Sequence, residues 1–103
     1  MKPWVVALTP YLKHVLWGGS ELQRHYGKDA PMDAPVGESW EVSCIPGQES
    51  LEASSRVPLA KLVEDAPAHF LGVDAVARDF PLLVKLICTR DLLSLQVHPD
   101  DEA

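Results

Sequence analysis

The side chains best suited to chemistry lie close to the end of the chain, at Ser94, Gln96 and His98. Residues 93–98 alternate apolar and polar, and in a β-strand this pattern places the three polar side chains on one face. Neutral imidazole is the commonest protein ligand of metal ions, and the Gln96 amide two residues earlier points to the same side. The spacing is consistent with two ligands of a metal site. Taken alone, it is equally consistent with a capping or surface histidine before Pro99.

Two further charged residues interrupt apolar patterns. Lys85 lies within the otherwise apolar run at residues 82–88. A lysine there either extends its ammonium group to the edge of the sheet or faces a polar cavity, where it would suit a phosphate or a sugar hydroxyl. Glu38 begins the alternating segment 38–43 and shares a face with Trp40, which is not the usual pattern of a solvent-exposed face.

Strands and short helices are expected to position these residues. Strands are predicted at residues 4–8, 38–43, 82–88 and 91–98, with a weaker pair within 50–57, and short helices at 20–26, 58–66 and 67–71. The nearly continuous apolar run at 82–88 is typical of a strand covered on both faces, with 91–98 as its hairpin partner. The class is therefore mainly β, either a sandwich or part of a barrel, with short helices in the connections.

Size and composition exclude several classes of protein. The 103 residues are enough for one small domain, and a formal net charge of −6 without a basic stripe argues against a nucleic-acid partner. No apolar run is long enough to span a bilayer, and the N-terminal run is too short for an export signal, which favours the cytoplasm. Cys44 and Cys88 are isolated, so reduced thiols are expected rather than a disulfide framework or a thiolate metal cluster.

Four sequence blocks together resemble the type I mannose-6-phosphate isomerases, which are zinc enzymes of the cupin fold. In the order of that family, the blocks are Leu12-Lys13 with Trp17-Gly18-Gly19, residues 37–43, residues 80–85 and residues 93–101. The last block contains Gln-Val-His-Pro-Asp-Asp and is the most specific. The resemblance extends from about Pro10 to Ala103. It implies a partial cupin-like jelly roll in which residues 1–103 form the N-terminal part of a catalytic domain.

The resemblance also implies roles for single residues. Gln96 and His98 would be two of the zinc ligands, and the substrate pocket would include Trp17, Glu38, Lys85 and Ser94. The implied reaction is the reversible isomerisation of mannose 6-phosphate and fructose 6-phosphate by proton transfer between C1 and C2, with zinc as a Lewis acid. None of the residues is assigned as the catalytic acid or base.

The family's remaining zinc ligands and an arginine associated with its catalysis belong to sequence beyond Ala103. The 103-residue chain by itself is therefore expected to be inactive and to bind metal weakly. The alternative to an isomerase is a non-catalytic module that binds a sugar phosphate or a metal on the same partial scaffold.

Overall fold

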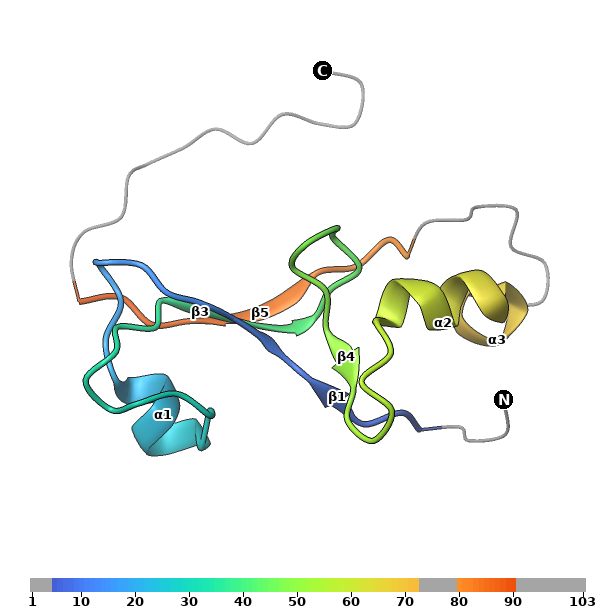
Figure 1. The fold of residues 1–103 in the computed structure, drawn as a ribbon. Helices are drawn as coiled ribbons and strands as arrows, with labels where there is room; N and C mark the ends of the chain where they lie inside the picture. The colour runs from blue at the N-terminus through green and yellow to red at the C-terminus, as the bar shows by residue number, and fades with distance from the viewer. Residues whose placement is uncertain (1–4, 73–79, 91–103) are drawn as a thin grey trace, which may run out of the picture.

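The structure is a computed structural model that describes residues 5–72 and 80–90 of the chain (Figure 1). Its strands are β1 (Leu8–Thr9), β2 (Tyr11–Lys13), β3 (Glu38–Val42), β4 (Leu51–Glu52) and β5 (Val84–Ile87), and its helices are α1 (Glu21–Tyr26), α2 (Leu59–Asp65) and α3 (Pro67–Leu71). Two small sheets joined by short helices confirm the mainly β class. None of the helices in the described ranges has the length and apolar character needed to cross a membrane.

The larger sheet has the strand order β2-β3-β5 and is antiparallel throughout. Tyr11 and Lys13 of β2 lie opposite Trp40 and Glu38 of β3, and Lys85 of β5 lies opposite Trp40 from the other side. Directly opposed residues of antiparallel strands share a face of the sheet. The register therefore gathers these five side chains on one face.

The other face of this sheet packs on α1, which lies beside one end of the sheet in Figure 1. Leu22 of α1, Val36 and Cys88 form the buried cluster, and Leu12 and Leu86 pack against it from β2 and β5. Leu12 and Leu86 lie opposite the same residue of β3, so they share its face. One face of the sheet is thus apolar and covered, which leaves the other face for polar side chains.

The boundaries of α1 are those predicted from the sequence. The helix starts after Ser20 and stops at Gly27, whose φ of 63° lies in the left-handed region that favours glycine. The loop that follows is fastened to the helix by Gln23, whose Nε2 donates hydrogen bonds to the carbonyl oxygens of Pro31 at 3.0 Å and Ala34 at 2.8 Å. This loop leads directly into β3.

The first strand lies later in the chain than predicted. Residues 4–8 were expected to form it, whereas β1 comprises Leu8–Thr9 and β2 begins after Pro10. Proline has no N–H to donate and interrupts a hydrogen-bonded ladder. The chain consequently changes sheets at Pro10, from β1, which pairs with β4, to β2, which pairs with β3.

The strand predicted at residues 82–88 is also shorter than expected. β5 comprises Val84–Ile87, and described residues do not cover it on both faces, because Leu82, Val84 and Ile87 are exposed. No strand within residues 5–72 pairs with its outer edge. The predicted hairpin partner at residues 91–98 lies outside the described residues.

The two short helices predicted at residues 58–66 and 67–71 are both present. α2 buries Leu59 and Val63, which confirms the helical spacing of its apolar residues. The weaker pair of strands expected within residues 50–57 is reduced to β4.

Candidate functional site

Glu38 is the centre of a polar cluster on the face of the β2-β3-β5 sheet that lies opposite α1. The residue is only 8% exposed, and its Oε1 accepts hydrogen bonds from the Trp40 indole N–H at 2.7 Å and from Lys85 Nζ at 3.0 Å. Trp40 follows two residues later on β3, and Lys85 lies opposite Trp40 on β5. The sheet register therefore delivers both donors to one carboxylate oxygen.

Two lysines flank the Trp40 ring. Nζ of Lys13 and Nζ of Lys85 each lie 5.4 Å from the ring centroid, within the range of a cation–π interaction. Tyr11 packs edge-to-face on the same ring, with 5.9 Å between ring centroids. The cluster thus joins side chains from all three strands of the sheet around a single buried indole.

The surroundings keep Glu38 ionised. Burial acts to raise its pKa, but the hydrogen bonds from Lys85 and Trp40 and the positive charges of Lys85 and Lys13 outweigh burial and lower the pKa below its ordinary value. The cluster then contains two lysines and one carboxylate, a surplus of one positive charge. Such a surplus suits an anionic ligand, and ammonium groups form strong hydrogen bonds to phosphate oxygens.

The carboxylate of Glu38 also retains accepting capacity. Both donors reach Oε1, and no residue in the described ranges donates to Oε2. An ionised carboxylate accepts hydrogen bonds through both of its oxygens. Oε2 can therefore accept a hydrogen bond from a ligand hydroxyl.

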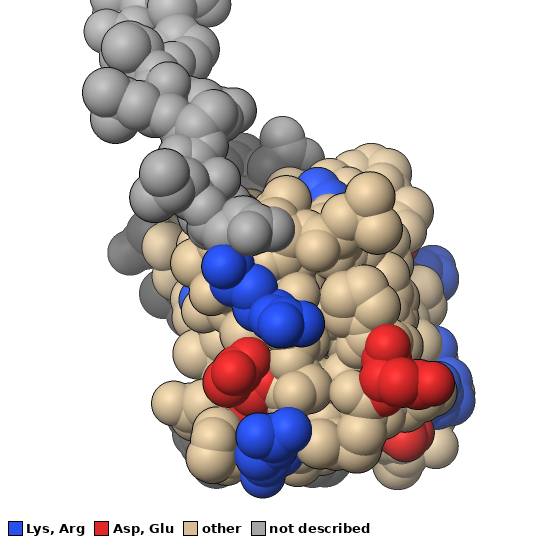
Figure 2. Space-filling model, turned by 90° about the vertical axis from the view of Figure 1, so that its left-hand side faces the viewer, with Lys and Arg blue, Asp and Glu red and all other residues tan. Residues whose placement is uncertain are grey.

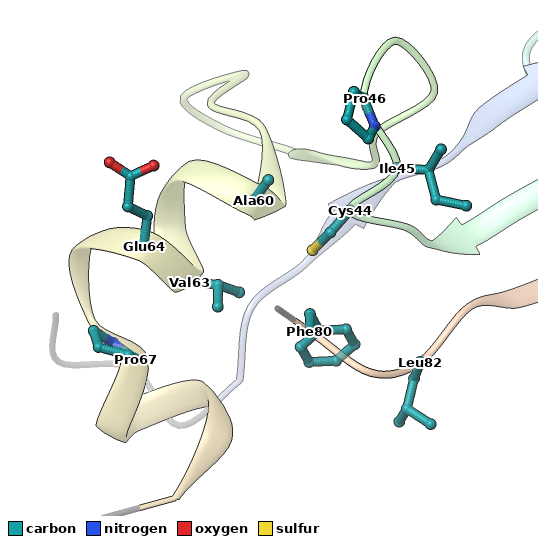
Figure 3. Close-up of a pocket in the computed structure, with 9 residues that line it drawn as sticks. All are labelled: Cys44, Ile45, Pro46, Ala60, Val63, Glu64, Pro67, Phe80 and Leu82. Atoms are coloured by element: carbon teal, nitrogen blue, oxygen red, sulfur yellow. The ribbon is translucent and has the colours of Figure 1, made fainter. Parts of the chain in front are cut away.

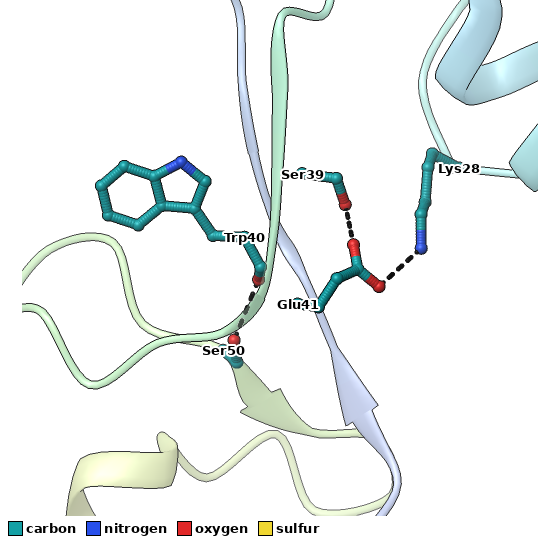
Figure 4. A network of polar contacts seen from close by, with 5 residues as sticks. All are labelled: Lys28, Ser39, Trp40, Glu41 and Ser50. Atoms are coloured by element: carbon teal, nitrogen blue, oxygen red, sulfur yellow. Dashed lines mark hydrogen bonds and ion pairs between the residues drawn. The ribbon is translucent and has the colours of Figure 1, made fainter. Parts of the chain in front are cut away.

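The second acid of β3 has a different role. Figure 4 shows Ser39, Glu41 and Lys28 on the opposite side of the strand from the Trp40 ring. Lys28 Nζ lies 2.9 Å from Glu41 Oε1, and the Ser39 hydroxyl donates to the other carboxylate oxygen. Because Lys28 follows α1 directly, this ion pair ties the helix layer to β3. Glu41 is thus structural, whereas Glu38 lies on the other face of the sheet.

The comparisons with known proteins agree with this architecture. The family model described as "Phosphomannose isomerase type I, catalytic domain" matches residues 5–103. This chain belongs to that family. The mannose-6-phosphate isomerase of Streptococcus mutans is 36% identical over 89 residues, covering 84% of this chain and 27% of the relative. For the mannose-6-phosphate isomerase of Escherichia coli K12 the identity is 32%, with 86% of this chain and 24% of the relative covered.

A solved structure of this family is also similar. The crystal structure of the mannose 6-phosphate isomerase from Bacillus subtilis superposes with a TM-score of 0.83 at 34% identity, covering 94% of this chain and 31% of that protein. The match supports the mainly β, cupin-like class expected from the sequence. The chain spans about a quarter to a third of the length of these phosphomannose isomerases.

Of the residues that the resemblance places in the substrate pocket, the structure brings Glu38 and Lys85 together and leaves Trp17 beside them. The Trp17 ring packs on Gly37, where an added Cβ would lie 2.7 Å from Trp17 Cζ3. Gly37 immediately precedes Glu38. Within the described ranges, however, no hydrogen bond or ring contact joins Trp17 to the cluster.

Glycines bring two of the phosphomannose isomerase sequence blocks into contact. A Cβ at Gly18 would lie only 2.5 Å from the backbone nitrogen of Gly37, so neither block has room for a side chain at this crossing. Gly37 also receives a hydrogen bond from Cys88 N–H at 2.8 Å. The blocks are therefore held at the end of β3, next to Glu38.

Sequence reasoning did not assign a site role to Lys13, Tyr11 or Trp40. Lys13 lies within one of the blocks that carry the family resemblance, but nothing in its local pattern distinguishes it from a surface lysine. Tyr11 and Lys13 are two residues apart, so alternation places them on one face. Only the register with β3 shows that this face is the one that carries Glu38.

The predicted metal ligands and the fourth predicted pocket residue are not described by the structure. Gln96, His98 and Ser94 all lie beyond residue 90, outside the described ranges. Within those ranges, no group of three or more His, Cys, Asp or Glu side chains is placed to hold a metal ion. Imidazole is a common zinc donor, and the assignment of Gln96 and His98 as ligands stays a prediction.

A second hollow of the described chain lies elsewhere and has different chemistry. It is a groove of about 620 Å³ between α2, α3 and the segments around Cys44 and Phe80 (Figure 3). It is lined by Cys44, Ile45, Pro46, Ala60, Val63, Glu64, Pro67, Phe80 and Leu82. A large apolar pocket is ordinarily a good candidate for a ligand site. This one is lined by an acid and no base, so it does not suit the sugar phosphate of a phosphomannose isomerase.

The charged surface beside α1 carries no separate anion-binding stripe. Figure 2 shows this end of the molecule, where basic and acidic side chains are interspersed and separated by uncharged surface. Interspersed charges of opposite sign create no extended surface of positive potential, and salt screens exposed charges beyond a Debye length. The Glu38 cluster therefore remains the best candidate site in the described part of the chain.

Proposed function

We propose that this chain supplies part of the catalytic domain of a zinc-dependent isomerase that interconverts mannose 6-phosphate and fructose 6-phosphate. Membership of the type I phosphomannose isomerase family supports the reaction class. The observation that carries the proposal is the Glu38–Lys85 pair, held on the face of the sheet opposite α1 with a surplus positive charge. A sugar phosphate carries the two kinds of group that such a site can bind, namely an anionic phosphate and several hydroxyl groups.

The described side chains would bind and orient the substrate. Lys85 uses one donor on Glu38, and its side chain is 33% exposed, so its remaining N–H donors can reach a phosphate or hydroxyl oxygen. Glu38 Oε2 would accept a hydrogen bond from a sugar hydroxyl. Fixing the substrate through two contacts lowers the entropic part of the barrier to proton transfer between C1 and C2.

The remaining assignments rest on the family resemblance. Ser94 would extend the substrate pocket, and Gln96 and His98 would hold zinc. When bound, zinc would supply a Lewis acid that polarises the substrate oxygen at the reacting carbons. The group that moves the proton is not assigned to any residue of the described ranges.

A chimera tests the proposal directly. Residues 5–103 of this chain would replace the matching segment of the B. subtilis mannose 6-phosphate isomerase, which its backbone matches with a TM-score of 0.83. The chimera is expected to convert fructose 6-phosphate to mannose 6-phosphate. Lys85→Met should lower kcat/KM by about tenfold to a hundredfold, the loss expected for one hydrogen bond to a charged group. The 103-residue chain alone should show no turnover.

Controls separate binding from folding and from metal loss. Lys61→Met, on the exposed face of α2, should leave the chimera's activity unchanged. His98→Ala should abolish retention of zinc, measured by metal analysis, and a stoichiometric zinc content in that variant would refute the ligand assignment. A folded chimera without turnover would contradict the isomerase. If that chimera still bound mannose 6-phosphate saturably, the non-catalytic module would be the better description.

A further inference from the structure

We infer that Trp40 is a positioning residue for Glu38: its indole N–H holds Oε1 of the carboxylate in place, so that Oε2 is directed to a ligand on the face of the sheet opposite α1. The inference rests on the proposed function for the nature of that ligand. The geometry of the pair is independent of the reaction.

The contact between Trp40 and Glu38 is a hydrogen bond whose donor and acceptor are fixed by their chemistry. The indole nitrogen is a donor only, so the proton of the 2.7 Å hydrogen bond belongs to Trp40 and the carboxylate oxygen accepts it. Trp40 is 6% exposed, and leaving its buried N–H without an acceptor would be costly. Glu38 is therefore the acceptor that satisfies the buried indole N–H.

The indole is itself fixed by its neighbours. The Ser50 hydroxyl donates to the Trp40 carbonyl oxygen at 3.0 Å, which anchors the backbone (Figure 4). Tyr11 packs on the ring at an interplanar angle of 67°. A rigid aromatic donor is well suited to hold a carboxylate within the narrow range of orientations that a binding site needs.

Lys85 is not suited to that task. Its ammonium group sits on a flexible four-carbon stem with rotatable donors, and its side chain is a third exposed. If Lys85 turned towards a phosphate, Glu38 would lose that hydrogen bond but keep the one from Trp40. Lys13 would still lie over the Trp40 ring, 5.4 Å from its centroid. Trp40 thus allows Lys85 to change partners while Glu38 keeps its orientation.

The electrostatics of Glu38 point the same way. The groups that face it are Lys13 from β2, Lys85 from β5 and the neutral Trp40 donor from its own strand. The hydrogen bond from Trp40 is one of the influences that lower the Glu38 pKa against the opposing effect of burial. Removing the donor while keeping an aromatic ring should therefore raise that pKa.

NMR titration of the 103-residue chain tests the inference without substrate. Trp40→Phe keeps an aromatic ring that Tyr11 and the lysines can contact, but it lacks the N–H donor. Tyr11→Phe is the matched control, because it removes a hydroxyl group from the same cluster and keeps the Trp40 N–H donor. The carboxyl resonance of Glu38 should titrate at a higher pH in Trp40→Phe and at an unchanged pH in Tyr11→Phe. In the wild-type chain, the Trp40 indole N–H resonance should follow the titration of Glu38, while that of Trp17 should not. This last measurement needs no variant.

Kinetics of the chimera complete the test. Trp40→Phe should raise KM for fructose 6-phosphate about tenfold, as expected when one hydrogen bond to a charged group is lost. An indole resonance that ignores the titration of Glu38, or an unchanged Glu38 pKa in a folded Trp40→Phe chain, would overturn the positioning role. The predicted titrations together with an inactive parent chimera would support that role and contradict the proposed function instead.

Discussion

Replacing Lys85 by methionine removes the ammonium group that lies 3.0 Å from Glu38 Oε1 and keeps an unbranched side chain. Glu38 then retains the hydrogen bond from Trp40 and the more distant charge of Lys13. Burial is the largest single influence on Glu38, and it favours the protonated acid. The substitution is therefore expected to raise the pKa of Glu38 and to destabilise the folded chain at neutral pH.

The size of the effect follows from the geometry of the pair. Two unit charges 3.0 Å apart attract by about 1.4 kcal/mol in bulk water and by about 5.5 kcal/mol at an effective dielectric constant of 20. Lys85 is 33% exposed and Glu38 is 11% exposed in its side chain, so the pair lies between these limits and desolvation offsets part of the gain. Lys85→Met should lower the free energy of unfolding by about 1–2 kcal/mol, or the midpoint by roughly 4–16 °C.

The effect should depend on pH with a definite sign. A carboxyl whose pKa is lower in the folded than in the unfolded state contributes stability above its unfolded pKa, and this stability is lost as the pH falls through the folded pKa. The Glu38 pKa is lowered in the folded state. The unfolding free energies of wild type and Lys85→Met should therefore differ most near neutral pH and converge at acid pH.

Urea denaturation of a double-mutant cycle measures the pair directly. Glu38→Gln, Lys85→Met and the double variant should give a coupling energy of about 1 kcal/mol or more at neutral pH, and a smaller one in acid. A coupling energy below about 0.3 kcal/mol would refute the electrostatic reasoning, since independent sites agree to within that margin. So would a coupling energy that is the same at both pH values.

Three further predictions concern the surroundings of the site. Gly37→Ala should lower the free energy of unfolding by about 1–3 kcal/mol and red-shift tryptophan fluorescence, because its Cβ would displace a neighbouring indole; unchanged emission would contradict this packing. Lys28→Met should lower the free energy of unfolding, measured by thermal denaturation, by about 1–2 kcal/mol, because its ion pair with Glu41 is partly buried. Lys61→Met, whose ion pair is more than half exposed, should change it by no more than about 0.5 kcal/mol. The reverse ranking would contradict the structural role of the Lys28–Glu41 pair. Burial, with some help from Glu49, raises the pKa of Cys44, so iodoacetamide should modify it more slowly than a free thiol and Glu49→Gln should speed the reaction; equal rates would contradict it.

The sequence was sufficient to single out Glu38 and Lys85, because each is a charge placed inside an apolar pattern. It left two alternatives open for Lys85, an ammonium group at the edge of the sheet or one in a polar cavity. The structure combines features of both: the side chain is partly exposed and its ammonium group is paired within a polar cluster. The pairing itself needed the register of three strands, which depends on long-range contacts that local patterns do not contain.

The strand boundaries were wrong because strand pairing also depends on partners that lie far away in the sequence. The apolar run at residues 4–8 has the composition of a strand, but pairing depends on a partner, and the chain finds β4 and β3 only on either side of Pro10. The run at 82–88 resembles a doubly covered strand, yet residues 5–72 cover one face only. The helices α1 and α3 were predictable because Gly27 and Gly72 mark their ends in the sequence itself, and α2 because Leu59 and Val63 have helical spacing.

The alternation of β3 limits where this chain can gain or lose residues. An insertion or deletion between Gly37 and Trp40 would exchange the two faces, turning the indole towards the apolar cluster under α1 and Glu41 towards the lysines. The packing of α1 on the sheet and the polar cluster around Glu38 would both be disrupted by the same change. The turn at Gly47, by contrast, has a φ of 81° and open space around the position of an added Cβ. Length changes should therefore be tolerated at that turn and selected against in β3.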